Sequence, residues 1–154
     1  LLRGVVATNP HVPAMRCGYA FALAQSGRLD EARDLLVDLM PPGTSSVTDD
    51  ANWSASTACL AETACLVGDV ERAAAILPHL EPLRDRFVVV TGFGAGGACW
   101  GPFSAVLGSL RRCLGDADGA RRELDHAVDA LDRFGAPLMR DRVVRLRDGV
   151  GTRG

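Results

Sequence analysis

GRLDEA at positions 27–32, GDVERA at 68–73 and GDADGA at 115–120 are three copies of one short pattern. In each copy a glycine is followed five residues later by an alanine, and four residues after that by a leucine. A small residue precedes each glycine by seven positions. The copies comprise Gly27, Ala32 and Leu36; Gly68, Ala73 and Leu77; Gly115, Ala120 and Leu124; the preceding small residues are Ala20, Ala61 and Gly108. Such recurrence predicts stacked copies of one supersecondary unit, because each unit buries its apolar face only against its neighbours.

Apolar side chains occur at helical spacing on both sides of each glycine, so each copy marks a tight bend between two helices. We therefore predict an all-α superhelix of three helix-turn-helix pairs plus a terminal helix, forming one repeat domain over residues 13–148. The expected units are 13–40, 50–84 and 100–134, then a helix at 137–148, with an irregular lead-in at 1–12 and a disordered tail at 149–154.

Two segments depart from this regular pattern. Pro78 and Pro82 lie within the second helix of the second unit, so we expect a kink or an early end near Leu77, because proline lacks the backbone N–H that a helix needs. Residues 85–99 are the least regular part, with the apolar, β-branched run Val88–Val90 followed by a glycine-rich stretch. We predict that helix resumes near Trp100.

Composition restricts the class of protein. The chain has 154 residues, 47% of them hydrophobic and 23% charged, with a formal net charge of −2. This charge gives no general attraction to nucleic acid or to anionic lipid, so we expect no direct nucleic-acid partner and no membrane partner. No apolar stretch approaches the ~20 residues that span a bilayer. The first residues lack the pattern of a secretory signal, and we expect a cytoplasmic location. Because the chain begins at Leu1 without methionine, we expect it to be a piece of something longer.

The bend pattern resembles the helix-turn-helix register of tetratricopeptide-like repeats. The small residue and the alanine let two helices approach closely in that family, although the copies here recur after 41 and 47 residues, against a usual period of about 34. The residues at the bends, together with Asn52-Trp53, also resemble the C-terminal helical repeats of large bacterial signalling ATPases. Those ATPases are linked to a LuxR-type DNA-binding domain or a nucleotide cyclase. The resemblance implies a region that binds proteins or senses signals, with the chemistry elsewhere in the parent chain.

Tryptophan gives a second register. Trp53 lies 15 residues before Gly68, and Trp100 lies 15 residues before Gly115. Core packing at the helix starts is the simpler interpretation. Alternatively, Trp53 and Trp100 are candidate partner-binding residues that line a concave surface, because tryptophan is enriched in interface hot spots.

The segment GFGAGG at 92–97 offers an alternative function. Gly92, Gly94 and Gly97 match G-x-G-x-x-G, a pattern that holds a pyrophosphate against a helix N-terminus when it lies within a βαβ unit. The alternative is therefore NAD- or ATP-type nucleotide binding through this connector. The other interpretation is a connector whose glycines allow close approach to neighbouring helices.

The remaining reactive residues predict no site. The five cysteines form no C-x-x-C pair, and the three histidines are scattered, so we expect no metal site, no cofactor and buried reduced thiols. Cys59 and Cys65 are expected on opposite faces of one helix. Glu62 lies among apolar residues, where it could be a buried acid with a raised pKa or the partner of an arginine. The arginines of the last helix are interleaved with aspartates, which favours a solvated face.

The sequence thus predicts a non-catalytic protein-interaction or regulatory module, cut from a larger ATP-dependent transcriptional or signalling regulator. Its partner would be a protein or peptide in a concave groove, or another domain of the parent chain.

Overall fold

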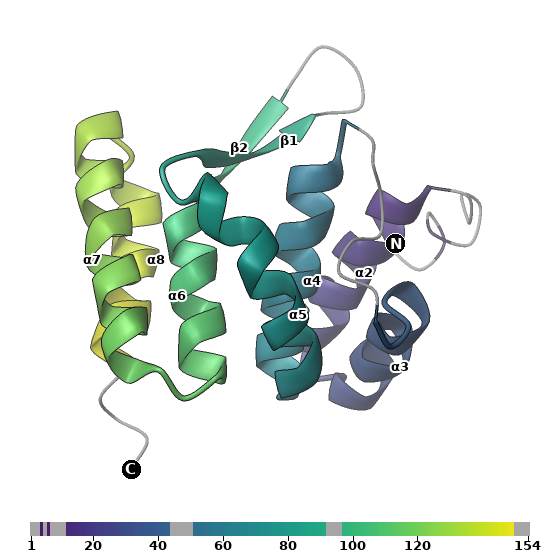
Figure 1. The fold of residues 1–154 in the computed structure, drawn as a ribbon. Coiled ribbons are helices and arrows are strands. Elements are labelled where there is room, and N and C mark those ends of the chain that lie inside the picture. Colours follow the sequence, from purple (N-terminus) through teal and green to yellow (C-terminus); the bar gives the residue numbers. More distant parts are fainter. Residues whose placement is uncertain (1–3, 5, 7–11, 44–50, 92–96, 150–154) are drawn as a thin grey trace.

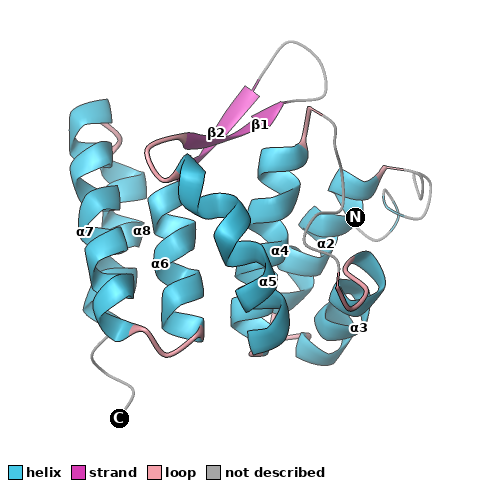
Figure 2. Ribbon diagram, viewed as in Figure 1, coloured by secondary structure: helices cyan, strands magenta, loops and turns pink. Residues whose placement is uncertain are grey.

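The computed structural model describes residues 4, 6, 12–43, 51–91 and 97–149 (Figure 1). Most of these residues are helical, and two short strands form a hairpin (Figure 2). The elements are, in order, α2 (Pro13–Gln25), α3 (Leu29–Leu39), α4 (Trp53–Val67), α5 (Val70–Leu80), the 3₁₀ turn η1 (Glu81–Leu83), β1 (Phe87–Thr91), β2 (Gly97–Pro102), α6 (Phe103–Cys113), α7 (Ala117–Phe134) and α8 (Pro137–Asp148). The glycine bends therefore join α2 to α3, α4 to α5 and α6 to α7.

The three bends share one backbone conformation. Gly27, Gly68 and Gly115 have φ angles of +80°, +72° and +81°, in the left-handed region that favours glycine. In each bend the N–H of the next residue donates to the carbonyl five residues earlier, as in a Schellman helix end. These pairs are Arg28 with Leu23 (3.0 Å), Asp69 with Ala64 (2.8 Å) and Asp116 with Arg111 (2.9 Å). The repeated sequence pattern is thus a repeated structure at the bends.

Small side chains allow the helices of each pair to approach. The alanines of the pattern at 20, 32, 61, 73 and 120 are all fully buried. The approach is tight in the third pair, where a Cβ on Gly108 would lie 2.6 Å from Cγ of Leu124 and 3.3 Å from the carbonyl oxygen of Ala120. Glycine is therefore required at 108 by space, whereas the bend glycines are required by their φ angle.

The helix pairs pack side by side along the chain (Figure 1). The first helix of each pair contacts the first helix of the next, so that α2 packs on α4 and α4 on α6, while α8 packs on α7. One apolar core runs from α2 through α6 and includes the hairpin. A second, smaller core lies between α7 and α8, where Leu131 and Val143 are buried. Within the described residues, no helix has both the length and the apolar character needed to cross a membrane.

The hairpin is a small addition to a mostly helical chain, so the all-α expectation holds in outline but did not include these two strands. β1 and β2 pair antiparallel, with a register irregularity between Val88 and Val89. Residues 85–99 are therefore not simply irregular, and helix resumes at Phe103 rather than at Trp100, which lies in β2. The physical reason is that the β-branched run favours a strand and buries Val88 completely against the core. The partner strand contains two glycines and a proline, and it is held by this pairing rather than by its own propensity.

Other boundaries differ in detail. α5 continues through Pro78 to Leu80 and then tightens into η1, so the helix does not end near Leu77. Pro78 lies in the last turn, where one missing N–H removes only one hydrogen bond. In the expected irregular lead-in, Gly4 and Val6 are helical. Residues 150–154 of the expected disordered tail lie outside the described residues.

Candidate functional site

The two tryptophans lie in different kinds of element. Trp53 is the first residue of α4 and packs half-buried against the core, whereas Trp100 lies in β2. Their shared spacing from a glycine therefore does not place them at equivalent helix positions, because the hairpin replaces the first turns expected in the third unit. The Trp100 ring meets Phe21 of α2 edge-on, with ring centroids 4.9 Å apart. The guanidinium carbon of Arg142 lies over the Trp100 ring, 5.8 Å from its centroid, so Trp100 connects α2 to α8.

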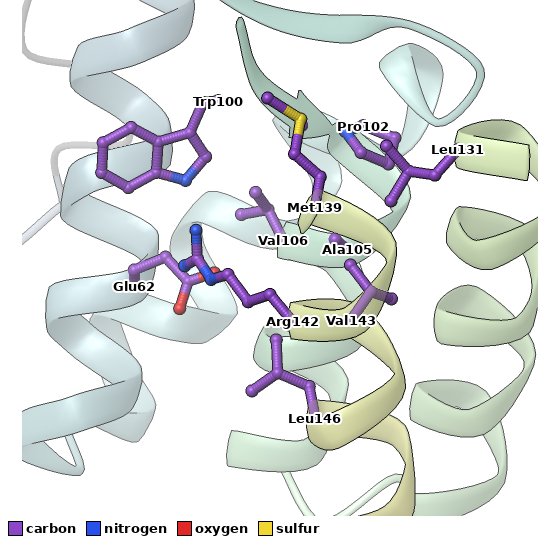
Figure 3. A pocket seen from close by; sticks show the side chains of 11 residues that line it. Glu62, Trp100, Pro102, Ala105, Val106, Leu131, Met139, Arg142, Val143 and Leu146 are labelled. Carbon is purple, nitrogen blue, oxygen red and sulfur yellow. The ribbon is translucent and has the colours of Figure 1, made fainter. Parts of the chain in front are cut away.

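Trp100 borders a small pocket that is closed by α8 (Figure 3). Its volume of about 20 Å³ is room for a single water molecule. Its walls are mostly apolar and come from α4, β2, α6, α7 and α8. The residues labelled in Figure 3 are Glu62, Trp100, Pro102, Ala105, Val106, Leu131, Met139, Arg142, Val143 and Leu146. This pocket is too small for an organic ligand.

A larger groove lies next to this pocket, with a volume of about 690 Å³, which falls in the range of ligand-binding sites. Its lining comes from α2, α4, α6 and α8 and from the bends at Gly68 and Gly115. Glu62, Arg142 and Leu146 line both hollows and therefore separate them. The other lining residues are Gln25, Cys65, Leu66, Val70, Ser109, Arg112, Cys113, Ala117 and Gly149.

Glu62 is the buried acid of this groove. Its side chain, on α4, is only 8% exposed, and the Ser109 hydroxyl of α6 donates a hydrogen bond of 3.3 Å to its Oε1. Burial raises the pKa of Glu62, while Arg142, the Ser109 hydrogen bond and Arg112 act in the opposite direction. Figure 3 shows the Arg142 guanidinium turned toward the Glu62 carboxyl group. Glu62 is therefore a buried acid, and the charges of Arg142 and Arg112 partly offset the effect of burial on its pKa.

Two arginines give the groove positive charge. Arg112 of α6 and Arg142 of α8 are both exposed and both line it. In the part of the chain that the structure describes, the ion pairs within 4.0 Å involve other arginines, such as Arg140 with Asp132 and Arg147 with Asp125. The interleaved aspartates therefore neutralise part of the last helix, whereas among the described residues that line the groove Glu62 is the one acidic side chain.

Two thiols meet on the same groove wall. Cys65 lies in the last turn of α4 and Cys113 ends α6, and the two side chains are hydrogen-bonded to each other. Cys17 and Cys59 are instead buried, and burial raises the pKa of Cys59 to about 12. Sequence reasoning missed the Cys65–Cys113 pair because their spacing is no motif. A usable signal was that both precede a bend glycine, by three and two residues.

The glycine connector has a context different from that of a dinucleotide fingerprint. Gly92 and Gly94 lie outside the described residues. Gly97 is the first residue of β2 and pairs with Thr91 of β1. The fingerprint requires a strand that leads into a helix within a parallel unit, whereas β1 is followed by an antiparallel strand. Comparisons of the chain with protein-family models, with curated proteins and with solved structures found no match.

Proposed function

We propose that the chain is a tetratricopeptide-like superhelix that binds an extended peptide or a helix of a partner protein in its groove. The repeated bends and the contacts between successive first helices support this architecture. In such arrays the first helices line a concave surface, and here α2, α4 and α6 contribute to the groove together with α8. The proposed role is to hold a partner and not to catalyse a reaction.

The observation that carries the proposal is the composition of the groove. Arg112 and Arg142 offer two exposed guanidinium groups, and the one acidic side chain among the described lining residues, Glu62, is buried. Leu66 and Leu146 add apolar surface beside these charges. Guanidinium groups bind carboxylates through paired hydrogen bonds, so this lining favours a peptide in which acidic side chains flank an apolar one.

We also propose a setting for this module. The resemblance of the bends to the repeats of bacterial signalling ATPases supports a regulatory module within a larger cytoplasmic protein that controls signalling or transcription. Its occupant would then be a partner protein or another domain of the parent chain.

Selection from a phage-displayed library of random peptides tests the proposal. We expect the wild-type chain to enrich peptides with acidic residues beside an apolar one. The double variant Arg112→Glu/Arg142→Glu should bind these peptides at least about tenfold more weakly, because like charges then face each other. Arg133→Glu is the matched control, since Arg133 is exposed on α7 and does not line the groove. Equal binding by the double variant and the wild type would contradict the proposal that the peptide binds in the groove.

A further inference from the structure

The hydrogen-bonded thiols of Cys65 and Cys113 belong to neighbouring units of the stack. Cys65 comes from α4 and Cys113 from α6, two helices that pack directly against each other. The structure records both as free thiols that are neither fully buried nor fully exposed, and both line the groove. A hydrogen bond between thiols on adjacent helices brings the two sulfur atoms near each other, which is the first requirement for a disulfide.

The groups around the pair make the two thiols unequal. The hydrogen bond from Cys65, with help from Arg112 of the same helix, lowers the pKa of Cys113 to about 7, although burial and Asp69 of the α4–α5 bend oppose this. The same hydrogen bond, burial and the nearby Glu62 raise the pKa of Cys65, and Arg112 only partly offsets them. Cys113 is therefore the nucleophilic sulfur, and Cys65 is the thiol that stabilises its thiolate.

We propose that Cys113 and Cys65 form a reversible oxidation site for small hydroperoxides, in which Cys113 is oxidised first and Cys65 then closes a disulfide between α4 and α6. This site goes beyond the proposed peptide binding and does not depend on it.

The two steps balance with one hydroperoxide as the oxidant. In the first step the Cys113 thiolate attacks a peroxide oxygen, the O–O bond breaks, and the departing hydroxide takes up a proton to become water. Cys113 is thereby oxidised by two electrons to a sulfenic acid as the peroxide is reduced. In the second step Cys65 loses its proton and its sulfur attacks Cys113 Sγ, the S–O bond breaks, and a second water leaves. Two thiols and one molecule of hydrogen peroxide thus give one disulfide and two waters.

Because Cys65 and Cys113 line the groove, their oxidation would change the groove. The disulfide would join the C-terminal ends of two successive first helices that line the groove. Because these helices also carry Glu62 and Ser109, the bond would fix the relative positions of the groove's buried polar groups. Oxidation would therefore alter the groove itself rather than a remote surface.

The test is peptide mapping of the wild-type chain after treatment with hydrogen peroxide at pH 7, without reduction. We expect one dominant linked peptide, which joins Cys65 to Cys113 and disappears after dithiothreitol. Cys65→Ser should leave a sulfenic acid on Cys113 that dimedone traps, because the serine hydroxyl still donates to the thiolate. Cys99→Ser is the matched control, since Cys99 is also partly exposed but lies in β2, and it should form the Cys65–Cys113 link as the wild type does.

A second measurement does not depend on any variant. In the wild-type chain at pH 7, iodoacetamide should alkylate Cys113 on the order of tenfold faster than Cys99, because the hydrogen bond from Cys65 and the charge of Arg112 lower the pKa of Cys113 and favour its thiolate. Scrambled links among several cysteines, no link at all, or equal alkylation of Cys113 and Cys99 would overturn the proposal. None of these readouts uses a peptide partner, so failure of the peptide selection leaves them unchanged.

Discussion

Gly108 of α6 lies where the second helix of its pair leaves no room for a side chain. An added Cβ would meet Leu124 Cγ at 2.6 Å and Cδ2 at 2.8 Å, inside any normal carbon–carbon contact. Both residues are buried, so neither helix can move without disturbing the core. Space, rather than backbone conformation, therefore selects glycine here.

Gly108→Ala should destabilise the chain by about 1–3 kcal/mol through overpacking, even though alanine favours helix by about 1 kcal/mol relative to glycine. Gly18→Ala is the matched control, because Gly18 lies inside α2 with nothing within 4 Å of an added Cβ. The control should be neutral or more stable than the wild type. Urea unfolding followed by circular dichroism measures both, and equal effects of the two substitutions would contradict this account of Gly108.

Glu62 gives the chain a specific pH dependence. Burial is the largest influence on its carboxyl group and raises its pKa in the folded state above the ordinary value of 4.5. The folded state then binds more protons than the unfolded state between these two pKa values. The contribution of Glu62 to stability is thus fully present below about pH 4.5 and is lost as the pH rises through the folded-state pKa.

We therefore expect the free energy of unfolding of the wild type to fall relative to that of Glu62→Gln as the pH rises from 4 to 8. Glutamine keeps an acceptor for the Ser109 hydroxyl but carries no titrating proton. Urea unfolding at a series of pH values measures the difference between the two proteins. A difference that does not change with pH would show that Glu62 is not held in an environment that favours its neutral form.

At the scale of elements, the bends could be predicted because their causes are local. A left-handed glycine followed by a helix N-terminus is specified by a few adjacent residues, and Asp69 and Asp116 accept hydrogen bonds from N–H groups three residues later. β2 could not be predicted in this way, because its residues become a strand only by pairing with β1. For the same reason, the equal spacing of Trp53 and Trp100 from their glycines wrongly predicted that both residues begin a helix, whereas Trp100 lies in β2.

Gly68→Ala tests the conformational requirement of a bend. Its φ of +72° costs an L-residue about 1–2 kcal/mol, although an added Cβ meets no neighbour. Gly27→Ala and Gly115→Ala should cost similar amounts, because their φ angles are nearly the same. Thermal or urea unfolding of the three variants measures this, and a bend that accepts alanine without loss would have to adopt another conformation.

At the scale of the whole molecule, the sequence indicated how many units stack but not which side chains the stack brings together. The pairing of Cys65 with Cys113, and of Glu62 with Ser109, depends on how α4 rests on α6. Such contacts follow from the offset between successive units, and the spacings of 41 and 47 residues do not specify that offset. The groove is therefore a property of the assembled stack, and its residues are visible only there.

Hydrogen exchange at the three bend amides tests the central claim most directly, namely that one bend is built three times and orders the whole stack. The N–H groups of Arg28, Asp69 and Asp116 each donate to a carbonyl five residues earlier. We predict that all three amides are protected from exchange in the native protein, as hydrogen-bonded amides in ordered bends are. Exchange of any one of them at the rate of an unfolded chain would contradict a stack of three equivalent helix pairs.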